Sequence, residues 1–282
     1  QRSLQRPRLV WRRRVGLVAV AILVVGVLGM AGCGTGPATS PKPLPPSDRA
    51  GYEYVFYDNF DTPAPLGTFL DVYGDTFRAY DEPYQDTSRS KRGTTSGYYD
   101  PGRTLSVANG NLDAWLHYDS TLGKYLVSAV IPKLPTMAYG QFVIRLRTDK
   151  IPGYKAVPLL WPDSDNWPAD GEIDFPEGPL DGSPWSAVMH YAQSDGGQDS
   201  FDTGVNGDHW HDYEIDWSPG QVDFLVDGKR IGRATHAVPA QPMHWVLQFE
   251  TLPDGPAPSK DAQGHVYIDW VKVYRAVSSS SP

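Results

Sequence analysis

Three carboxylates stand close together in the segment Glu172–Glu177, which reads EIDFPE and is otherwise apolar. Burying a carboxylate in a strand is costly unless the group is paired or used. Like charges held close push their pKa values apart, so that one group stays ionised while another keeps a proton near neutral pH. An ionised carboxylate beside a protonated one can cleave a glycosidic bond with retention of configuration. Glu172, Asp174 and Glu177 are therefore the candidate catalytic residues.

The spacing of these acids requires an irregular strand. Side chains alternate faces along a regular strand, so Glu172 and Asp174 share one face while Glu177 points to the other. One extra residue in a β-bulge returns Glu177 to the shared face. Pro176 has no N–H for the sheet ladder, and proline is typical of edges, strand ends and bulges. The proline therefore predicts a bulge that brings all three acids together.

The elements that must position this segment are predicted to be antiparallel strands. Apolar residues alternate with polar ones through 141–147, 213–217 and 222–226. Asp227-Gly228 then gives a strong hairpin signal. Alternation with one polar face favours antiparallel pairing, and several such strands at regular spacing indicate a sandwich. The sequence predicts an all-β antiparallel sandwich.

Several motifs of the chain resemble those of glycoside hydrolase family 16, which includes laminarinases and other endo-β-glucanases. The acidic segment fits the family pattern E-x-D-x-x-E. The resemblance runs from about Tyr54 to Tyr274. Its further motifs are YGQF at 139–142, the tryptophan-rich run at 161–172, HDYEIDW at 211–217, VDGK at 226–229 and YIDWVKVY at 267–274.

This resemblance implies a concanavalin-like β-jelly-roll with a concave substrate cleft. It makes Glu172 the nucleophile, Asp174 the residue that orients and tunes it, and Glu177 the acid/base. The implied activity is retaining endo-hydrolysis of a neutral β-linked polysaccharide, chiefly β-1,3- or mixed-linkage β-glucan, by double displacement with no cofactor required for catalysis. The EID tripeptide recurs at 214–216, but Pro219 stands where the third acid would be. We interpret that second copy as an ordinary strand face.

Aromatic and polar residues near the acids are candidates for binding sugar rings. The apolar C–H faces of sugars stack on aromatic planes, although large aromatics also serve as core residues. Pro, Asp and Asn flank Trp161 and Trp167, which favours the cleft for these two, whereas core and cleft both stay open for Trp185. The expected substrate-binding residues are Trp161, Trp167, Trp185, His190, Tyr191 and Gln248.

The resemblance also carries finer expectations. It places His190 close to the acid/base, where a hydrogen bond could hold the acid. Gln248 lies in a run, VLQFET, that differs from the usual family sequence, and it would take over a sugar contact there. Together with Phe175-Pro176, this departure leaves the identity of the sugar open. Asp269 resembles a calcium-binding aspartate, and carboxylates are ligands that Ca²⁺ prefers, so a structural calcium is expected there.

The charge of the chain restricts its partners. The 282 residues carry a formal charge of −8, which becomes −14 without the six arginines of residues 1–32. Such an acidic body disfavours nucleic acid and other polyanions. The expected partner is a polysaccharide substrate, and the expected oligomeric state is a monomer.

The first residues are typical of an export signal. Arg12–Arg14 precede an apolar run at 15–30, and small residues then lead to Cys33. This end resembles a bacterial lipoprotein signal, which makes Cys33 the expected lipid-bearing residue. Since Cys33 is the single cysteine, an intrachain disulfide is excluded. An uncleaved signal anchor is the alternative, because the apolar run is nearly long enough to span a bilayer.

The expected organisation has four parts. A lipoprotein signal peptide covers 1–32, a Pro-rich tether covers 33–50 and a catalytic domain covers 51–275. A disordered tail covers 276–282. The expected location is the extracellular side of a cell membrane, held by the lipid anchor.

Two alternatives to hydrolysis remain open. A transglycosylase would use the same three acids and differ in water access and acceptor binding. A lectin-like binding module on the same sandwich would not need the acids at all.

Overall fold

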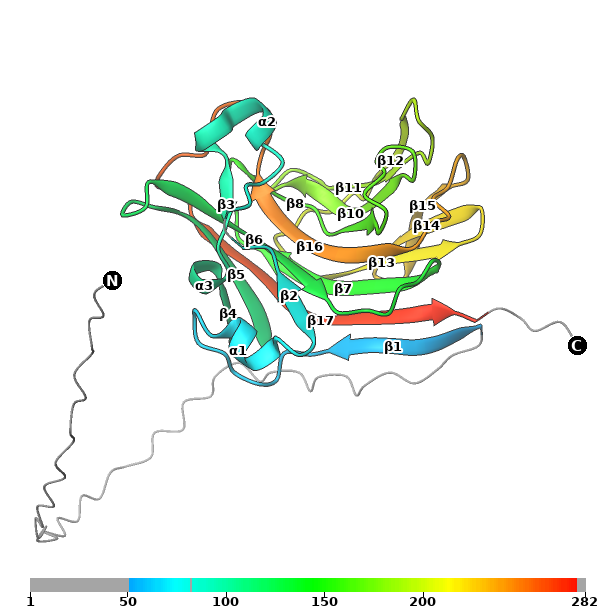
Figure 1. Cartoon of the computed structure of the whole chain (residues 1–282), viewed down its shortest axis with the longest axis horizontal. Helices are drawn as coiled ribbons and strands as arrows, with labels where there is room; N and C mark the ends of the chain where they lie inside the picture. Colours follow the sequence, from blue (N-terminus) through cyan, green and yellow to red (C-terminus); the bar gives the residue numbers. More distant parts are fainter. Residues whose placement is uncertain (1–50, 82, 278–282) are drawn as a thin grey trace, which may run out of the picture. The chain divides into compact units, whose positions relative to one another are not determined.

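The computed structural model describes residues 51–81 and 83–277, which form a body of two packed β-sheets with short helices beside them (Figure 1). The predicted signal peptide, Cys33 and tether lie outside the described residues, as does the tail beyond residue 277. Within the described part of the chain, no helix is long and apolar enough to cross a membrane.

One sheet, here called the outer sheet, is antiparallel throughout. It runs β4-β5-β17-β7-β13-β14-β15, and β1 pairs with the second half of β17. Its strands are β1 (Tyr52–Asp58), β4 (Leu105–Ala108), β5 (Asn111–Asp119), β7 (Gly140–Thr148), β13 (His211–Ser218), β14 (Gln221–Val226), β15 (Lys229–Ala234) and β17 (Gly264–Ala276).

The second sheet, here called the cleft sheet, carries the acidic segment. From β6 it continues through β16 to β8 and β9, which both pair with β10, and then to β11 and β12. β2 pairs with β6 in antiparallel fashion and β3 in parallel fashion. The strands are β2 (Phe77–Ala79), β3 (Gly97–Tyr99), β6 (Lys124–Pro132), β8 (Tyr154–Ala156), β9 (Leu159–Pro162), β10 (Glu172–Pro179), β11 (Ser186–His190), β12 (Gln198–Asp202) and β16 (Met243–Thr251).

The helices are single turns in connecting segments. They are α1 (Phe69–Tyr73), α2 (Arg89–Arg92), the 3₁₀ turn η1 (Gly93–Thr95) and α3 (Pro101–Thr104). Asp100 caps α3 by accepting a hydrogen bond from the backbone N–H of Arg103, and Pro101 occupies the first turn. In Figure 1, α2 lies next to β3 at one end of the cleft sheet.

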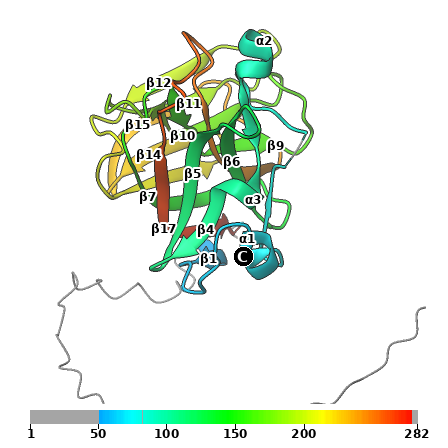
Figure 2. The ribbon, with the colours of Figure 1, turned by 90° about the vertical axis from the view of Figure 1, so that its left-hand side faces the viewer.

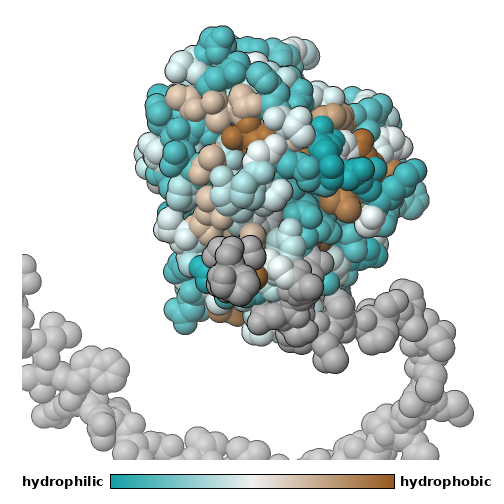
Figure 3. Space-filling view, turned by 90° about the vertical axis from the view of Figure 1, so that its right-hand side faces the viewer, coloured by the Kyte–Doolittle hydropathy of each residue, from teal (hydrophilic) through white to brown (hydrophobic). Residues whose placement is uncertain are grey.

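The main core lies between the two sheets. Tyr213, Ile215 and Trp217 of β13 point inward and are at most 1% exposed, and Val222 and Phe224 of β14 are fully buried. Their predicted alternation is therefore confirmed, and so is the antiparallel sandwich. Figures 1 and 2 both show β10 and β11 on the opposite side of the body from β1. On the face in Figure 3, the described apolar residues occur as separate spots among hydrophilic ones.

Phe175 joins the acidic strand to the outer sheet. Its ring makes edge contacts with Tyr213 and Phe224, at centroid distances of 5.5 Å and 5.3 Å, and is 1% exposed. Because the neighbouring acids lie on the other face of β10, this core contact fixes the orientation of the strand.

We expect Phe175→Ala to lower the free energy of unfolding by about 3–5 kcal/mol, because it leaves a cavity between the sheets. Urea denaturation monitored by tryptophan fluorescence measures this change. The control is Leu122→Ala at an exposed turn, where the side chain is 39% exposed and the expected change is within about 0.5 kcal/mol. Equal effects of the two substitutions would contradict this role of Phe175.

Candidate active site

The strand that carries the acids contains the predicted bulge. Asp174 pairs with Val188 and Glu177 pairs with Ser186, so two residues of β10 lie opposite one residue of β11. Pro176 is one of the two. The extra residue changes the phase of alternation between the second and the third acid. The bulge inferred from the proline is confirmed.

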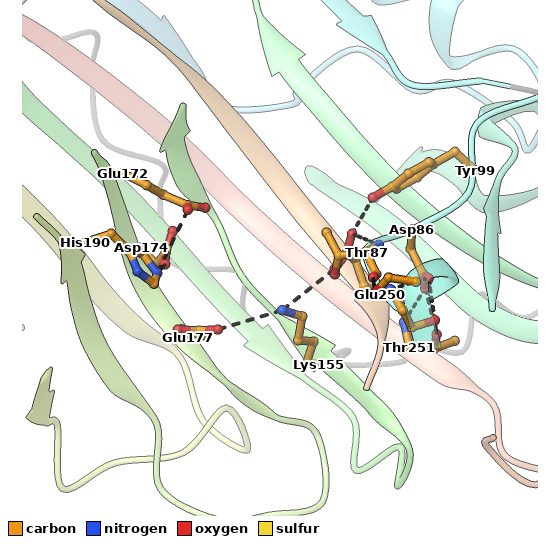
Figure 4. Close-up of polar contacts among 12 residues, drawn as sticks. Asp86, Thr87, Tyr99, Lys155, Glu172, Asp174, Glu177, His190, Glu250 and Thr251 are labelled. Atoms are coloured by element: carbon orange, nitrogen blue, oxygen red, sulfur yellow. Dashed lines mark hydrogen bonds and ion pairs between the residues drawn. The ribbon is translucent and has the colours of Figure 1, made fainter. Parts of the chain in front are cut away.

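The bulge places the three acids on one side of β10. Ile173 and Phe175 belong to the core and are at most 1% exposed. Figure 4 shows the carboxyl groups of Glu172, Asp174 and Glu177 on the same side of the strand. The side chains of the first and the third are 12% and 29% exposed, whereas that of Asp174 is 3% exposed. Two acids thus border solvent while the middle one lies beneath them.

Glu172 and Asp174 form a coupled pair. Burial, followed by the charge of Asp174, raises the pKa of Glu172 to about 9. Burial, followed by the charge of Glu177, raises the pKa of Asp174 well above its usual range. Oδ1 of Asp174 is buried and receives no hydrogen bond from any N–H or hydroxyl donor. A hydrogen bond between the two carboxyl groups therefore needs a proton on one of them, so the pair holds one shared proton at neutral pH.

The position of that proton follows from burial. A charge costs least where some water remains, and Glu172 is the more exposed of the two carboxyls. A protonated Asp174 that donates to Glu172 leaves the negative charge on the oxygen atoms that face the cleft. The arrangement thus provides an oriented carboxylate with a neutral partner below it.

His190 contacts this pair from the neighbouring strand. It lies opposite Glu172 in the β10–β11 register, and its Nε2 is 3.1 Å from Oδ2 of Asp174 and 3.9 Å from Oε2 of Glu172. The expected hydrogen bond to the acid/base is wrong, because the imidazole reaches the other two acids.

The ligand atoms of Glu172, Asp174 and His190 lie within 4.8 Å of one another, so they could also hold a metal ion. The ring of Trp167, 48% exposed, packs edge-on against His190 at 6.1 Å.

Glu177 has a different environment. Its Oε1 is 3.7 Å from Nζ of Lys155 on β8, and the same ammonium is 3.7 Å from Oε2 of the fully buried Glu250 on β16. Sequence reasoning did not find Lys155 or Glu250. A single lysine and a single glutamate on two separate strands form no motif, and their proximity depends on strand pairing.

Cavities lie on both sides of the acids. One of about 580 Å³ is lined by Glu172, Trp161, Gln248 and Tyr80, among others. A second of about 700 Å³ shares Tyr80 and Arg78 with the first, and a third of about 310 Å³ is lined by Glu177 and Lys155. The acids therefore stand along a groove rather than in a closed pocket. Trp161 and Gln248 are on that groove, and their sugar contacts stay predictions.

One expected substrate-binding residue, Trp185, is corrected. Trp185 is 1% exposed and packs against Tyr213, and its Nε1 donates to the backbone oxygen of Pro179. It also packs directly on Gly178, where any Cβ would lie 2.2 Å from its ring. Trp185 is thus a core residue. The ring of Tyr191 packs against the core and His236, and its hydroxyl donates to Asp199 at 2.7 Å, so its sugar contact stays a prediction.

The sequence reasoning missed the tyrosines of the groove. Tyr80, Tyr84 and Tyr99 line the first cavity, and the rings of Tyr80 and Tyr84 lie 6.3 Å apart. Tyr80 and Tyr84 belong to the segment FRAYDEPYQD at 77–86, which combines aromatic and polar residues far from the acids in sequence, and Tyr99 ends β3. That composition was a usable signal, but only the folding of this segment over β6 and β16 connects it with the site.

Asp269 lies on the outer sheet, away from the acids. Its Oδ2 is 3.3 Å from Nε of Arg145, and the same guanidinium pairs with Asp212 at 2.8 Å. A guanidinium at this position repels a cation. The observed contacts of Asp269 do not fit a calcium site, and the expectation of calcium stays a prediction.

Comparison with known proteins gives several similarities. One is the clotting factor G alpha subunit of Tachypleus tridentatus, 26% identical over 151 residues, which are 47% of this chain and 22% of that protein. The chain thus spans about a fifth of the length of this curated relative.

Among solved structures, a non-specific endo-β-1,3(4)-glucanase of family GH16 is 23% identical, with 83% of this chain and 95% of that chain covered and a TM-score of 0.64. The laminarinase from Rhodothermus marinus is 21% identical, with 80% and 98% covered and a TM-score of 0.65. Both show the same fold and confirm the expected jelly-roll.

Residues 102–272 match the family model described as glycosyl hydrolases family 16. This match covers more than half of the chain and includes every strand from β5 to β16, with the acidic β10 at its centre. The resemblance inferred from the motifs is confirmed. The expected enzyme class, a glycoside hydrolase, is confirmed with it. The chain belongs to glycosyl hydrolases family 16.

Proposed function

We propose that this protein is a retaining endo-glycoside hydrolase acting on a neutral β-linked glucan. One observation carries the proposal: the bulge in β10 gives Glu172, Asp174 and Glu177 a common face between two cavities of one groove. A carboxylate with a neutral partner and a second, separately placed acid are the groups that double displacement needs.

The reaction would proceed in two steps. Oε of Glu172 attacks the anomeric carbon, and the glycosidic C–O bond breaks while its oxygen takes a proton from Glu177. Water then attacks the same carbon, gives a proton to Glu177, and releases the sugar from Glu172. Asp174 keeps its proton throughout and supports the carboxylate of Glu172 whenever that group is charged.

The groove favours cleavage at internal bonds of a polysaccharide. One cavity borders Glu172 and another borders Glu177, so they would flank a glycosidic bond held between the two acids. Sugar units can thus occupy both sides, which an endo-acting enzyme requires. Trp161, Tyr80 and Tyr84 offer aromatic rings on the first side.

β-1,3-glucan or mixed-linkage β-glucan is the proposed substrate. The support comes from the solved structures of the same fold, which are named as a laminarinase and as a non-specific endo-β-1,3(4)-glucanase. The acidity of the body also favours a neutral polysaccharide over an anionic one.

Export and a lipid on Cys33 are also proposed. The support is the sequence pattern alone, in which three arginines, an apolar run and small residues precede the single cysteine. A membrane anchor would keep the hydrolase at the cell surface, where polymeric glucan is accessible.

We expect Glu172→Gln to abolish the release of reducing ends from laminarin, because an amide oxygen is a poor nucleophile. The assay is reducing-end formation, with proton NMR of the first-formed anomer to test retention. The matched control is Glu214→Gln in the second EID copy, which should keep full activity. Turnover near that of the wild type in Glu172→Gln would rule out the assignment.

Relative to the wild type, the same variant should become more stable as the pH rises. Burial and the mutual repulsion of Glu172 and Asp174 let the pair keep its shared proton in the folded chain, where the pKa of Glu172 is raised to about 9 from an ordinary value of 4.5. Between these values the folded state binds more protons than the unfolded state, so rising pH lowers the free energy of unfolding. From pH 5 to pH 8 the advantage of Glu172→Gln should grow, by up to about 1.4 kcal/mol per pH unit. Denaturation curves at several pH values measure it, and parallel profiles would contradict the buried proton.

Replacing the single cysteine tests the anchor. We expect Cys33→Ser to move the protein from the membrane fraction to the soluble exported fraction and to abolish labelling by a palmitate analogue. Catalytic activity should stay unchanged, because the groove is built from residues of the described body. An unchanged membrane fraction would point to the alternative of an uncleaved signal anchor.

A further inference from the structure

We propose that Lys155 is a positioning residue for the acid/base Glu177, which it ties to the buried carboxylate of Glu250. This inference rests on the proposed function. Figure 4 shows the ammonium between the carboxylates of Glu177 and Glu250. Both N···O distances are 3.7 Å, and the lysine side chain is 13% exposed.

Strand pairing puts Lys155 in this place. The short strand β8 lies between β10 and β16, and Lys155 pairs with Pro179 on one side and with Glu250 on the other. Its contact with Glu250 is therefore a direct cross-strand pair. Glu177 lies two residues before Pro179, within reach of a long side chain. The cation can thus touch both neighbouring strands at once.

Glu250 is a rigid anchor for this cation. It is fully buried and accepts hydrogen bonds from the backbone N–H of Thr87 at 3.1 Å, its hydroxyl at 2.6 Å and the hydroxyl of Tyr99 at 2.5 Å. Asp86, beside Thr87, is held in turn by Ser88 and Thr251. A carboxylate with this many donors has one orientation, so the ammonium opposite it is fixed as well.

The electrostatic surroundings keep Lys155 charged. Burial lowers its pKa, but the nearby carboxylates outweigh burial, and the pKa lies above its usual value. The groups that act on it are Glu250 of β16 and Glu177, Asp174 and Glu172 of β10. Asp254, after β16, has a pKa lowered mainly by Lys91, and the charge of Lys155 contributes to the same shift. The ammonium is thus a permanent cation among acids.

A fixed cation has two uses beside the acid/base. Glu177 has a long, partly exposed side chain that must meet the leaving oxygen in the first step and water in the second. The ammonium holds the carboxyl group in one orientation, by its attraction for the carboxyl oxygen while Glu177 is protonated and as an ion pair once Glu177 is ionised. It also stabilises the carboxylate that forms when Glu177 gives its proton to the leaving group. A loss of this cation should therefore impair proton donation more than sugar binding.

The test compares two substrates of equal size. Phenyl β-laminaritrioside has a poor leaving group that needs protonation, whereas the 2,4-dinitrophenyl analogue leaves without it. For Lys155→Met we expect kcat/KM to fall about 100-fold on the phenyl substrate and less than about fivefold on the dinitrophenyl substrate. Lys155→Arg should recover much of the loss, because it keeps the charge. Lys272→Met, over Trp270 on the outer sheet, is the matched control with no expected change.

A second variant keeps the test valid if Lys155→Met does not fold. Lys155→Met leaves the buried Glu250 without its cation, which destabilises the fold. The double variant Lys155→Met/Glu250→Gln removes both charges. We expect the double variant to show the same difference in kcat/KM between the two substrates. An equal loss on both substrates, in whichever variant folds, would overturn the positioning role, since a structural defect or a lost sugar contact lowers both alike. If the wild type cleaves neither substrate nor laminarin, the proposed function fails and this inference with it.

Discussion

The site depends on one constraint, which is to hold the carboxylates of one strand away from water while leaving charge on the side that faces the groove. Asp174 is almost completely buried, and its pKa is raised by burial first and by the charge of Glu177 second. A proton shared with Glu172 meets the constraint on one side. A lysine between Glu177 and a buried glutamate meets it on the other.

The architecture of the cleft sheet follows from this constraint. The bulge between Asp174 and Glu177 provides the common face, and the ring of Phe175 on the opposite face of β10 packs into the core so that the strand cannot rotate. β10 changes its partner from β9 to β8 just after the bulge. That change brings Lys155 beside the third acid but not beside the first. Two carboxylates five residues apart thus experience different neighbours.

The second EID copy shows how much depends on these surroundings. Glu214 and Asp216 lie on β13 of the outer sheet, and Asp216 accepts hydrogen bonds from Tyr52 at 2.8 Å and Gln141 at 3.0 Å. No bulge is recorded in the pairing of β13 with β7 or β14. The same three residue types therefore form an ordinary strand face, as the missing third acid predicted. Local sequence supplies the carboxylates, and the sheet decides what they can do.

Features that depend on neighbours along the chain could be predicted from the amino-acid sequence: alternating strands, a bulge marked by Pro176, three acids on one face, and the family. The sequence did not determine which side chains meet across strands. Trp185 was expected to bind substrate because it is near β10 in sequence, yet it is a core residue. Lys155 and Glu250 are 95 positions apart, and Tyr80 and Tyr84 of the groove come from a segment about 90 residues before the acids. Only the tertiary structure decided these contacts, because strand pairing brings together residues whose distance along the chain carries no signal.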